Sequence, residues 1–332
     1  MFNNKRIVVF GGAGSVGKEL VFRILRERRA WDGSTTHVTV FSRDEQKHHA
    51  MKSQLGWAAN GSEKQVEFVV GDVSNLLKVR NVIRTANIVV FAAAMKHVDA
   101  CENNPDEAID TNVDGTRIIT SLLKLNNPEA RTLWMGTDKA ANPAGVYGET
   151  KHLQERLFQT SGLNCVGVRF GNIVPSSGSV IPMFRELAKA GKDLPVTCED
   201  MTRFFVPMKT VIDTIIDALW RAPARTITIP RMVSARIGDV ADFYCERYGV
   251  KKHIIGLRPA EKSHELLISP DELPRCNPLG DYWVVHPRED AAMASGVKPP
   301  ANTDHDMLTF SSAYGVMAKK TTATFLEICG QA

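Results

Sequence analysis

The stretch Arg6-Ile-Val-Val-Phe-Gly11-Gly-Ala-Gly14-Ser-Val-Gly17 joins a short apolar run to the start of a helical pattern. Glycines at 11, 14 and 17 permit a tight turn, close approach of backbone to a pyrophosphate, and close helix–strand packing. The helix that follows offers N–H donors and a favourable dipole to an anion. A purely structural glycine turn is the alternative, but the place of this triplet between a strand and a helix predicts a dinucleotide site. The residues expected to bind it here are Gly11, Gly14, Ser15, Val16 and Gly17.

Short runs rich in β-branched residues alternate with helical patterns through the first half of the chain. The runs occupy 6–10, 37–41, 66–70, 88–91, 132–135 and 166–169, and helices are expected over 15–28, 44–56, 76–84, 107–125 and 147–160. Runs this short, bounded by Gly, Asp or Ser, are typical of parallel strands covered on both faces. The alternation predicts an α/β fold with a doubly wound parallel Rossmann sheet.

The pattern changes after about residue 172, where Pro and Gly become frequent and the elements shorten. A strand is expected at 226–229 and a helix at 237–248. We expect a dinucleotide-binding Rossmann domain over 1–172 and a smaller α/β substrate-binding lobe over 173–332. The chain is expected to cross between the two lobes.

The composition indicates an ordinary globular protein of 332 residues, with 43% hydrophobic and 23% charged residues. A net charge of +4 gives no case for nucleic acid, although it suits an anionic ligand. The six cysteines are scattered without metal-ligand spacing, so we expect reduced thiols and no metal. No apolar run approaches the roughly 20 residues of a membrane span, and no signal peptide is evident. We therefore expect a cytoplasmic enzyme with no membrane partner.

The end of the second strand predicts which dinucleotide binds. Arg43, with Lys47 one turn later, favours the 2′-phosphate of NADP, whereas Asp44 leaves NAD possible. Asp72 follows the third strand, where it is placed either to bond the adenine amine or to cap a helix. The other residues expected around the cofactor are Ser42, Val73, Ala92, Ala93, Ala94 and Lys96.

The stretch Thr137-Asp-Lys139-Ala-Ala-Asn-Pro-Ala-Gly-Val-Tyr147-Gly-Glu-Thr-Lys151 carries the candidate chemistry. Tyr147 and Lys151 are four apart and share one face of a helix. An adjacent Lys lowers the pKa of a phenol, which then serves as a base toward an alcohol or sugar hydroxyl. Asp138 and Lys139 add a second acid/base pair that simple alcohol oxidation does not need. The alternative for this second pair is a surface ion pair of little energetic value.

Tyr147-x-x-x-Lys151 and the glycine triplet resemble the extended short-chain dehydrogenases/reductases. Further motifs are similar to the UDP-N-acetylglucosamine 4,6-dehydratases, and among them to the inverting form that begins routes to pseudaminic acid. The likeness runs from residue 2 to about residue 268. The segments that carry it are 41–45, 92–98, 137–143, 169–172, 201–204 and 258–265.

The resemblance implies NADP-dependent removal of water across C5–C6 of a UDP-sugar. Tyr147 would take the C4 hydroxyl proton, and Lys151 would lower the pKa of that tyrosine and bond the nicotinamide ribose. Lys139 would abstract the C5 proton, Asp138 would protonate the departing C6 hydroxyl, and Thr137 would hold the C4 oxygen.

The resemblance also implies a nucleotide-sugar-binding lobe and a homo-oligomer. Lys96, Asn172, Arg203, Arg258 and Glu261 would contact the substrate, the two arginines at its diphosphate because a guanidinium suits phosphate geometry. Solvated or structural positions are the alternatives for these residues and for Arg169.

The chain departs from the family pattern at several positions. Gly136 stands where the family has Ser, Phe10 where it has Thr, and Ala260 where it has Gly, while residues 175–177 replace a Gly-Ser-Arg turn. A different nucleotide sugar therefore stays open. The rival functions are a nucleotide-sugar 4-epimerase or reductase on the same fold, and a dinucleotide-sensing regulator without turnover.

Overall fold

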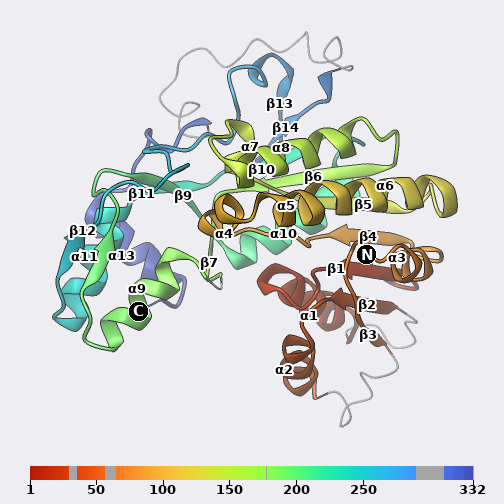
Figure 1. Ribbon diagram of the computed structural model, residues 1–332, viewed down its shortest axis with the longest axis horizontal. Helices are drawn as coiled ribbons and strands as arrows, with labels where there is room; N and C mark the ends of the chain where they lie inside the picture. The colour runs from red at the N-terminus through yellow and green to blue at the C-terminus, as the bar shows by residue number, and fades with distance from the viewer. Residues whose placement is uncertain (30–35, 57–64, 177, 289–309, 332) are drawn as a thin grey trace.

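The computed structural model describes residues 1–29, 36–56, 65–176, 178–288 and 310–331. Ser177, part of the departing turn, lies outside these residues. A nine-stranded sheet is the centre of the larger body (Figure 1). Its order is β13 (Cys276–Leu279), β14 (Tyr282–Val285), β10 (Ile227–Pro230), β6 (Cys165–Phe170), β5 (Arg131–Thr137), β4 (Ile88–Phe91), β1 (Arg6–Phe10), β2 (His37–Ser42) and β3 (Val66–Val70).

The strands from β10 to β3 run parallel, and β14 and β13 add an antiparallel edge. The order 3-2-1-4-5-6 is that of a doubly wound dinucleotide-binding sheet, so the predicted fold class is confirmed. Because β1, β4 and β6 are almost wholly buried on both faces, their sequences are continuous apolar runs rather than alternating ones.

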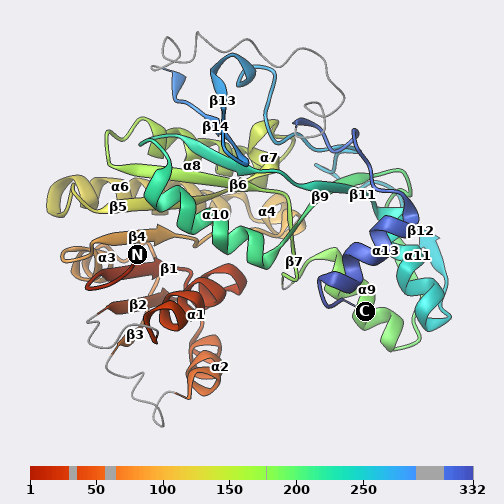
Figure 2. The same ribbon diagram turned by 180° about the vertical axis from the view of Figure 1, so that it is seen from behind.

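Helices cover both faces of this sheet (Figures 1 and 2). The helices α1 (Ser15–Arg29), α2 (Glu45–Leu55) and α10 (Met208–Arg221) pack into one apolar core. The opposite core takes side chains from α3 (Leu76–Ile83), α6 (Gly115–Asn126) and α8 (Val146–Gln159). Because β1, β4 and β5 are parallel neighbours, their carboxyl ends lie at the same edge of the sheet. The glycine loop follows β1 and the Thr137 stretch ends β5, so both lie at this edge.

The single helix expected over 107–125 is wrong in detail. After α4 (Val98–Asn103), α5 (Pro105–Ala108) leads into a π-helical turn, η2 (Ile109–Asp114), before α6. Asn112 explains the wider turn, because its side chain accepts from Met95 N–H at 2.9 Å and donates to Met95 C=O at 3.0 Å and to the Thr150 hydroxyl at 3.0 Å. These bonds tie the helix to α8, which carries the candidate phenol.

The smaller lobe has its own core. A sheet of β11 (Val233–Arg236), β9 (Thr202–Pro207) and β7 (Asn172–Val174), and a pair of β12 (Lys252–Ile254) and β8 (Leu194–Val196), pack with α9 (Val180–Lys189), α11 (Ile237–Tyr248) and α13 (Lys319–Ile328). The chain returns to the large sheet with α10, β10, β13 and β14, so residues 173–332 are divided between the two bodies (Figure 2).

A buried ion cluster joins the late segment of the chain to the Rossmann core. Arg169 at the end of β6 is fully buried, and its guanidinium pairs with Glu155 of α8 at 2.6 Å and with Glu272 at 2.8 Å. Burial acts to raise the pKa of Glu272, but Arg169 outweighs it and holds that pKa at about 2. Arg169 is therefore a structural residue.

Two features are absent from the described ranges. None of the helices within them is both long and apolar enough to cross a membrane. No group of three or more His, Cys, Asp or Glu side chains there is arranged to hold a metal ion.

Candidate active site

The glycine loop forms a cradle that suits a dinucleotide pyrophosphate. Gly11 has φ +73°, and a Cβ there would lie 2.7 Å from Ala93 N, while a Cβ on Gly17 would lie 2.5 Å from Gly11 O. Both glycines are therefore required by packing against their own chain. Gly14 differs, because its added Cβ would meet only Gly11 O, at 3.1 Å. Among the described residues, the space beside Gly14 is therefore open at the start of α1, whose first turn carries no acidic residue.

The charged groups at the tip of β2 form two ion pairs. Lys47 binds Asp44 at 2.9 Å, and Asp44 caps α2 by accepting from Lys47 N–H at 3.0 Å. Arg43 pairs with Asp72 at 3.3 Å and is 60% exposed. Asp72 does not cap α3, since that cap is Asn75. Arg43 is thus an exposed guanidinium at this strand end, while the Asp44 carboxylate is engaged by its own helix and by Lys47.

The other predicted cofactor residues line the same edge. Val73 is buried against Gly115 of α6. Ala92 and Ala93 contact Gly11 closely, as their small side chains allow. Lys96, at the rim, donates to the Ser176 hydroxyl at 3.3 Å and so bridges the two bodies.

Asp138 and Lys139 form a largely buried pair at the end of β5, with the Lys139 side chain 22% exposed, rather than a solvated surface pair. They open the short helix α7 (Asp138–Ala141), which Thr137 caps. The Lys139 Nζ lies 3.1 Å from Asp138 Oδ1, and the Thr137 hydroxyl donates to the same oxygen at 3.0 Å. The Asp138 side chain is 1% exposed, and its second oxygen, Oδ2, is buried with no hydrogen-bond partner among the residues that the structure describes. An acceptor left open at this place fits a proton or a ligand hydroxyl.

Tyr147 opens α8 beside this pair. Burial raises the pKa of Tyr147 to about 12, while the charge of Lys139 and a hydrogen bond with Thr137 act against that rise. The amine whose charge most favours the phenolate of Tyr147 is therefore Lys139, and the role of Lys151 in lowering this pKa stays a prediction.

Polar groups of the core hold the Lys151 amine. Its Nζ donates to Met135 C=O at 2.6 Å and to the Gln154 side chain, which in turn donates to the Thr116 hydroxyl at 3.0 Å. Burial lowers the pKa of Lys151 to about 8. The Lys151 amine is thus anchored by hydrogen bonds to Met135 C=O and Gln154.

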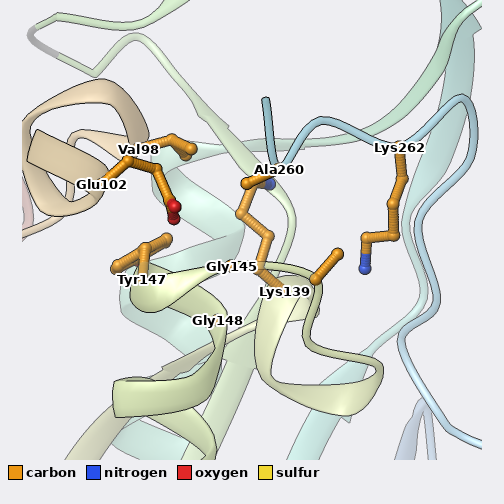
Figure 3. A pocket seen from close by; sticks show the side chains of 9 residues that line it. Val98, Glu102, Lys139, Gly145, Tyr147, Gly148, Ala260 and Lys262 are labelled. Carbon is orange, nitrogen blue, oxygen red and sulfur yellow. The ribbon is translucent and has the colours of Figure 1, made fainter. Parts of the chain in front are cut away.

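A small pocket opens onto Lys139 and Tyr147 (Figure 3). In that view, Val98 and Glu102 lie on one side, Lys262 lies on the other, and Lys139 and Ala260 lie between them. Glu102 also accepts from Val146 N–H at 2.6 Å and so fixes the start of α8. The complete lining consists of Val98, Glu102, Lys139, Ala144, Gly145, Tyr147, Gly148, Ala260 and Lys262.

None of the predicted substrate residues lines this pocket, although Arg258 and Glu261 flank its lining residue Ala260 in sequence. Arg203 is 6% exposed, which excludes a solvated face, and it donates to Thr202 C=O at 2.7 Å. Arg258 pairs with Asp99 at 3.1 Å, and its N–H donates to Glu261 at 3.2 Å. Asn172 is half-buried at the start of β7. Arg258 and Glu261 are thus hydrogen-bonded to each other, and Arg258 is paired with the first turn of α4.

Sequence reasoning assigned no role to two charged residues that lie at the centre of the site. Glu265 is 3.5 Å from Lys139 Nζ, and Lys262 is 2.9 Å from the other oxygen of Glu265. Both stand in the 258–265 motif that carried the resemblance. That motif was the available signal, but spacing alone did not connect it with Lys139.

The structure bears on two departures from the family pattern: it explains Gly136, and it places Ala260 in a backbone conformation that favours the glycine of the family. A Cβ on Gly136 would lie 2.4 Å from Glu155 Oε1, so the buried Arg169–Glu155 pair excludes a larger residue there. Ala260 has φ +63°, the left-handed region that favours glycine. Its methyl group faces Gly145 and narrows the pocket where the family has no side chain.

The doubly wound sheet, glycine cradle and Tyr147/Lys151 helix define an extended short-chain dehydrogenase/reductase fold. A crystal structure of Pen from Bacillus thuringiensis covers 100% of both chains at 26% identity, with a TM-score of 0.87. The family model described as polysaccharide biosynthesis protein matches residues 7–287, and the chain belongs to this family.

Curated relatives include enzymes with two different names. The UDP-N-acetylglucosamine 4,6-dehydratase (inverting) of Campylobacter jejuni subsp. jejuni serotype O:2 is 32% identical over 296 residues, which are 86% of this chain and 84% of that protein. The UDP-glucose 4-epimerase of Rickettsia akari is 33% identical over 293 residues, 85% and 83% of the two chains. The resemblance read from the motifs is confirmed, and the epimerase alternative has relatives of similar identity.

Proposed function

We propose that this chain is a nucleotide-sugar 4,6-dehydratase that acts on UDP-N-acetylglucosamine, inverts C5 and uses NADP. The observation that carries the proposal is the buried Asp138–Lys139 pair beside Tyr147. A 4-epimerase needs a base at C4 but no second acid/base pair for a C5–C6 elimination. The dehydratase relatives support the same reaction.

The redox half of the reaction falls to Tyr147 and Lys151. Tyr147, in its phenolate form, takes the proton of the C4 hydroxyl, and the charge of Lys139 favours that form. A bound nicotinamide supplies the acceptor and donor of two electrons. Lys151, anchored by Met135 C=O and Gln154, presents its remaining proton toward the ribose.

The elimination half falls to Asp138 and Lys139. As the protein stands, the pKa of Lys139 is above its usual value, because the Asp138 and Glu265 carboxylates outweigh the lowering effect of burial. One proton transfer from Nζ to Oδ1, over 3.1 Å, converts the ion pair into a free amine and a carboxylic acid. These are the base that C5 requires and the acid that the departing C6 hydroxyl requires.

Arg43 supports the choice of NADP. It is an exposed guanidinium at the end of β2, while the nearby Asp44 carboxylate is occupied by the α2 cap. A guanidinium binds a phosphate in bidentate fashion, whereas an NAD site requires a free carboxylate for the ribose hydroxyls. A cytoplasmic location and a homo-oligomer stay predictions.

The decisive experiment is incubation with UDP-N-acetylglucosamine followed by mass spectrometry. Dehydration lowers the mass of the sugar by one water, and epimerisation leaves it unchanged. A product of unchanged mass would select the 4-epimerase, which the Rickettsia relatives make the second candidate.

The role of Lys139 has its own test in heavy water. The Lys139→Ala variant should bind NADP as the wild type does, yet lose deuterium incorporation at C5. Lys209→Ala is a matched control, since Lys209 is 82% exposed and pairs only at the surface with Asp213. Normal incorporation in the Lys139 variant would remove this amine from the mechanism.

A further inference from the structure

Lys139 contacts two carboxylates, and the mechanism above uses only one of them. Asp138 is its neighbour in sequence, 3.1 Å from Nζ, whereas Glu265 arrives from the smaller lobe and lies 3.5 Å from the same atom. The Glu265 side chain is 3% exposed and the Lys139 side chain 22%. A carboxylate is seldom buried this deeply unless it is paired, so its charge acts on Lys139 with little screening by water.

The Glu265 carboxylate is held in place from several directions. The backbone N–H of Glu265 donates to the Ser312 hydroxyl at 2.8 Å, and the backbone C=O of Glu265 accepts from Ser312 N–H at 2.8 Å. Its second oxygen pairs with Lys262 at 2.9 Å, and Lys262 also donates to Asn142 C=O of the loop after α7. The carboxylate is thus fixed relative to the helix that carries Lys139.

We propose that Glu265 is a positioning residue for Lys139: it holds Nζ opposite Asp138 and favours the ammonium form of the amine. This inference rests on the proposed role of Lys139 as the C5 base. Glu265 raises the free energy needed to move the ammonium proton to Asp138, and it stabilises the ammonium form that Lys139 regains when it takes the C5 proton.

The charges around Lys139 decide the sign of the effect. Asp138 and Glu265 stabilise the ammonium, whereas Arg203 opposes it. Lys262 neutralises part of the Glu265 charge, and the phenol of Tyr147 and the Glu102 carboxylate face the same pocket. Removing the charge of Glu265 must therefore lower the pKa of Lys139, and removing that of Lys262 must raise it.

The first experiment measures Lys139 directly, without substrate. The protein is labelled with carbon-13 at the lysine ε position, the Lys139 signal is assigned by its loss in Lys139→Arg, and it is titrated by NMR. In Glu265→Gln, the midpoint should fall by about one pH unit or more, the size of shift expected for an opposite charge at this distance. An unchanged midpoint overturns the proposal.

The second experiment uses turnover. Activity is lost at high pH when the proton shared by Asp138 and Lys139 leaves, so the basic limb of the kcat profile should move to lower pH in Glu265→Gln. We expect kcat to fall about tenfold and KM to change less than threefold. In Lys262→Met the basic limb should move the opposite way. Limbs that do not move, or that move in the same direction in both variants, contradict the proposal.

Controls separate positioning from folding. Glu246→Gln is the matched surface control, since Glu246 is 69% exposed and pairs with Lys319. Glu265→Asp keeps the charge and should bring the basic limb back toward that of the wild type, even where Glu265→Gln folds poorly. If the wild type forms no dehydrated product while the NMR midpoint still shifts, the proposed function fails and the Glu265–Lys139 coupling stands.

Discussion

The buried cluster around Arg169 offers a stability test that does not depend on any ligand. Glu272 forms a two-armed pair with this guanidinium, with Oε1 and Oε2 each 2.8 Å from one of its terminal nitrogens, and it also accepts from Ser269 N–H at 3.0 Å. Its side chain is 8% exposed. Glu272→Gln preserves the shape of the side chain and removes the charge.

Two routes give the magnitude of this change. The pKa of Glu272 is lowered from 4.5 to about 2, which corresponds to about 3 kcal/mol in favour of the charged form. Breaking a buried ion pair by removing one partner costs roughly 3–5 kcal/mol. We therefore expect Glu272→Gln to lower the free energy of unfolding by about 3 kcal/mol at pH 7.

The direction of the pKa shift determines how the stabilisation by Glu272 changes with pH. Because the pKa is lower in the folded protein, the stabilisation is present above the unfolded value and is lost as pH falls toward about 2. Between pH 7 and pH 3, about 2 kcal/mol of the difference between the two proteins should disappear. Urea unfolding at a series of pH values measures this. A difference that is absent at pH 7, or that does not shrink in acid, would refute the reasoning.

A matched control is Asp271→Asn, the loss of a surface partner of Arg288. The Asp271 side chain is 68% exposed and the Arg288 side chain 56%. Exposed pairs contribute about 0–1 kcal/mol, so this variant should unfold almost as the wild type does.

Three further predictions concern the cofactor and the two departures from the family pattern. Arg43→Ala should weaken NADP binding at least about tenfold and leave NAD binding nearly unchanged, as measured by fluorescence titration; equal losses would contradict the NADP assignment. Gly136→Ser should destabilise by roughly 1–3 kcal/mol, since its Cβ meets Glu155 Oε1 at 2.4 Å; thermal unfolding would show no change if the carboxylate moves freely. Ala260→Gly should stabilise by about 0.5–1 kcal/mol, because φ is +63° there, and a less stable variant would show that the methyl contact with Gly145 matters more.

The first half of the fold was predictable because its elements are local. Each apolar run from 6–10 to 166–169 became a strand within about two residues of the expected ends. The glycine loop fell where the strand–helix pattern required. The second half gave weaker signals, since β7, β8 and β12 have only three residues each. Strands this short show no periodicity, and β9, β11, β13 and β14 were also not foreseen.

The site was partly predictable for the same reason. Thr137, Asp138, Lys139 and Tyr147 lie within one stretch, and a strand–helix unit brings them together. What spacing could not reveal is the direction of the Lys151 side chain, because Met135 and Gln154 compete for its protons. Glu265 could not be placed either, since its position depends on how the smaller lobe docks on α7.

The clamp between Glu265 and Ser312 has a consequence for the order in which the protein is made. Lys139, Asp138 and Tyr147 leave the ribosome early, in a sheet that can begin to form around β1 to β6. The carboxylate that faces Lys139 is synthesised much later, and Ser312, which holds its backbone on both sides, later still. A nascent chain that has not reached this serine has Lys139 and Asp138 in place without the second carboxylate, so the Glu265–Lys139 pair is fixed only after Ser312 has been synthesised.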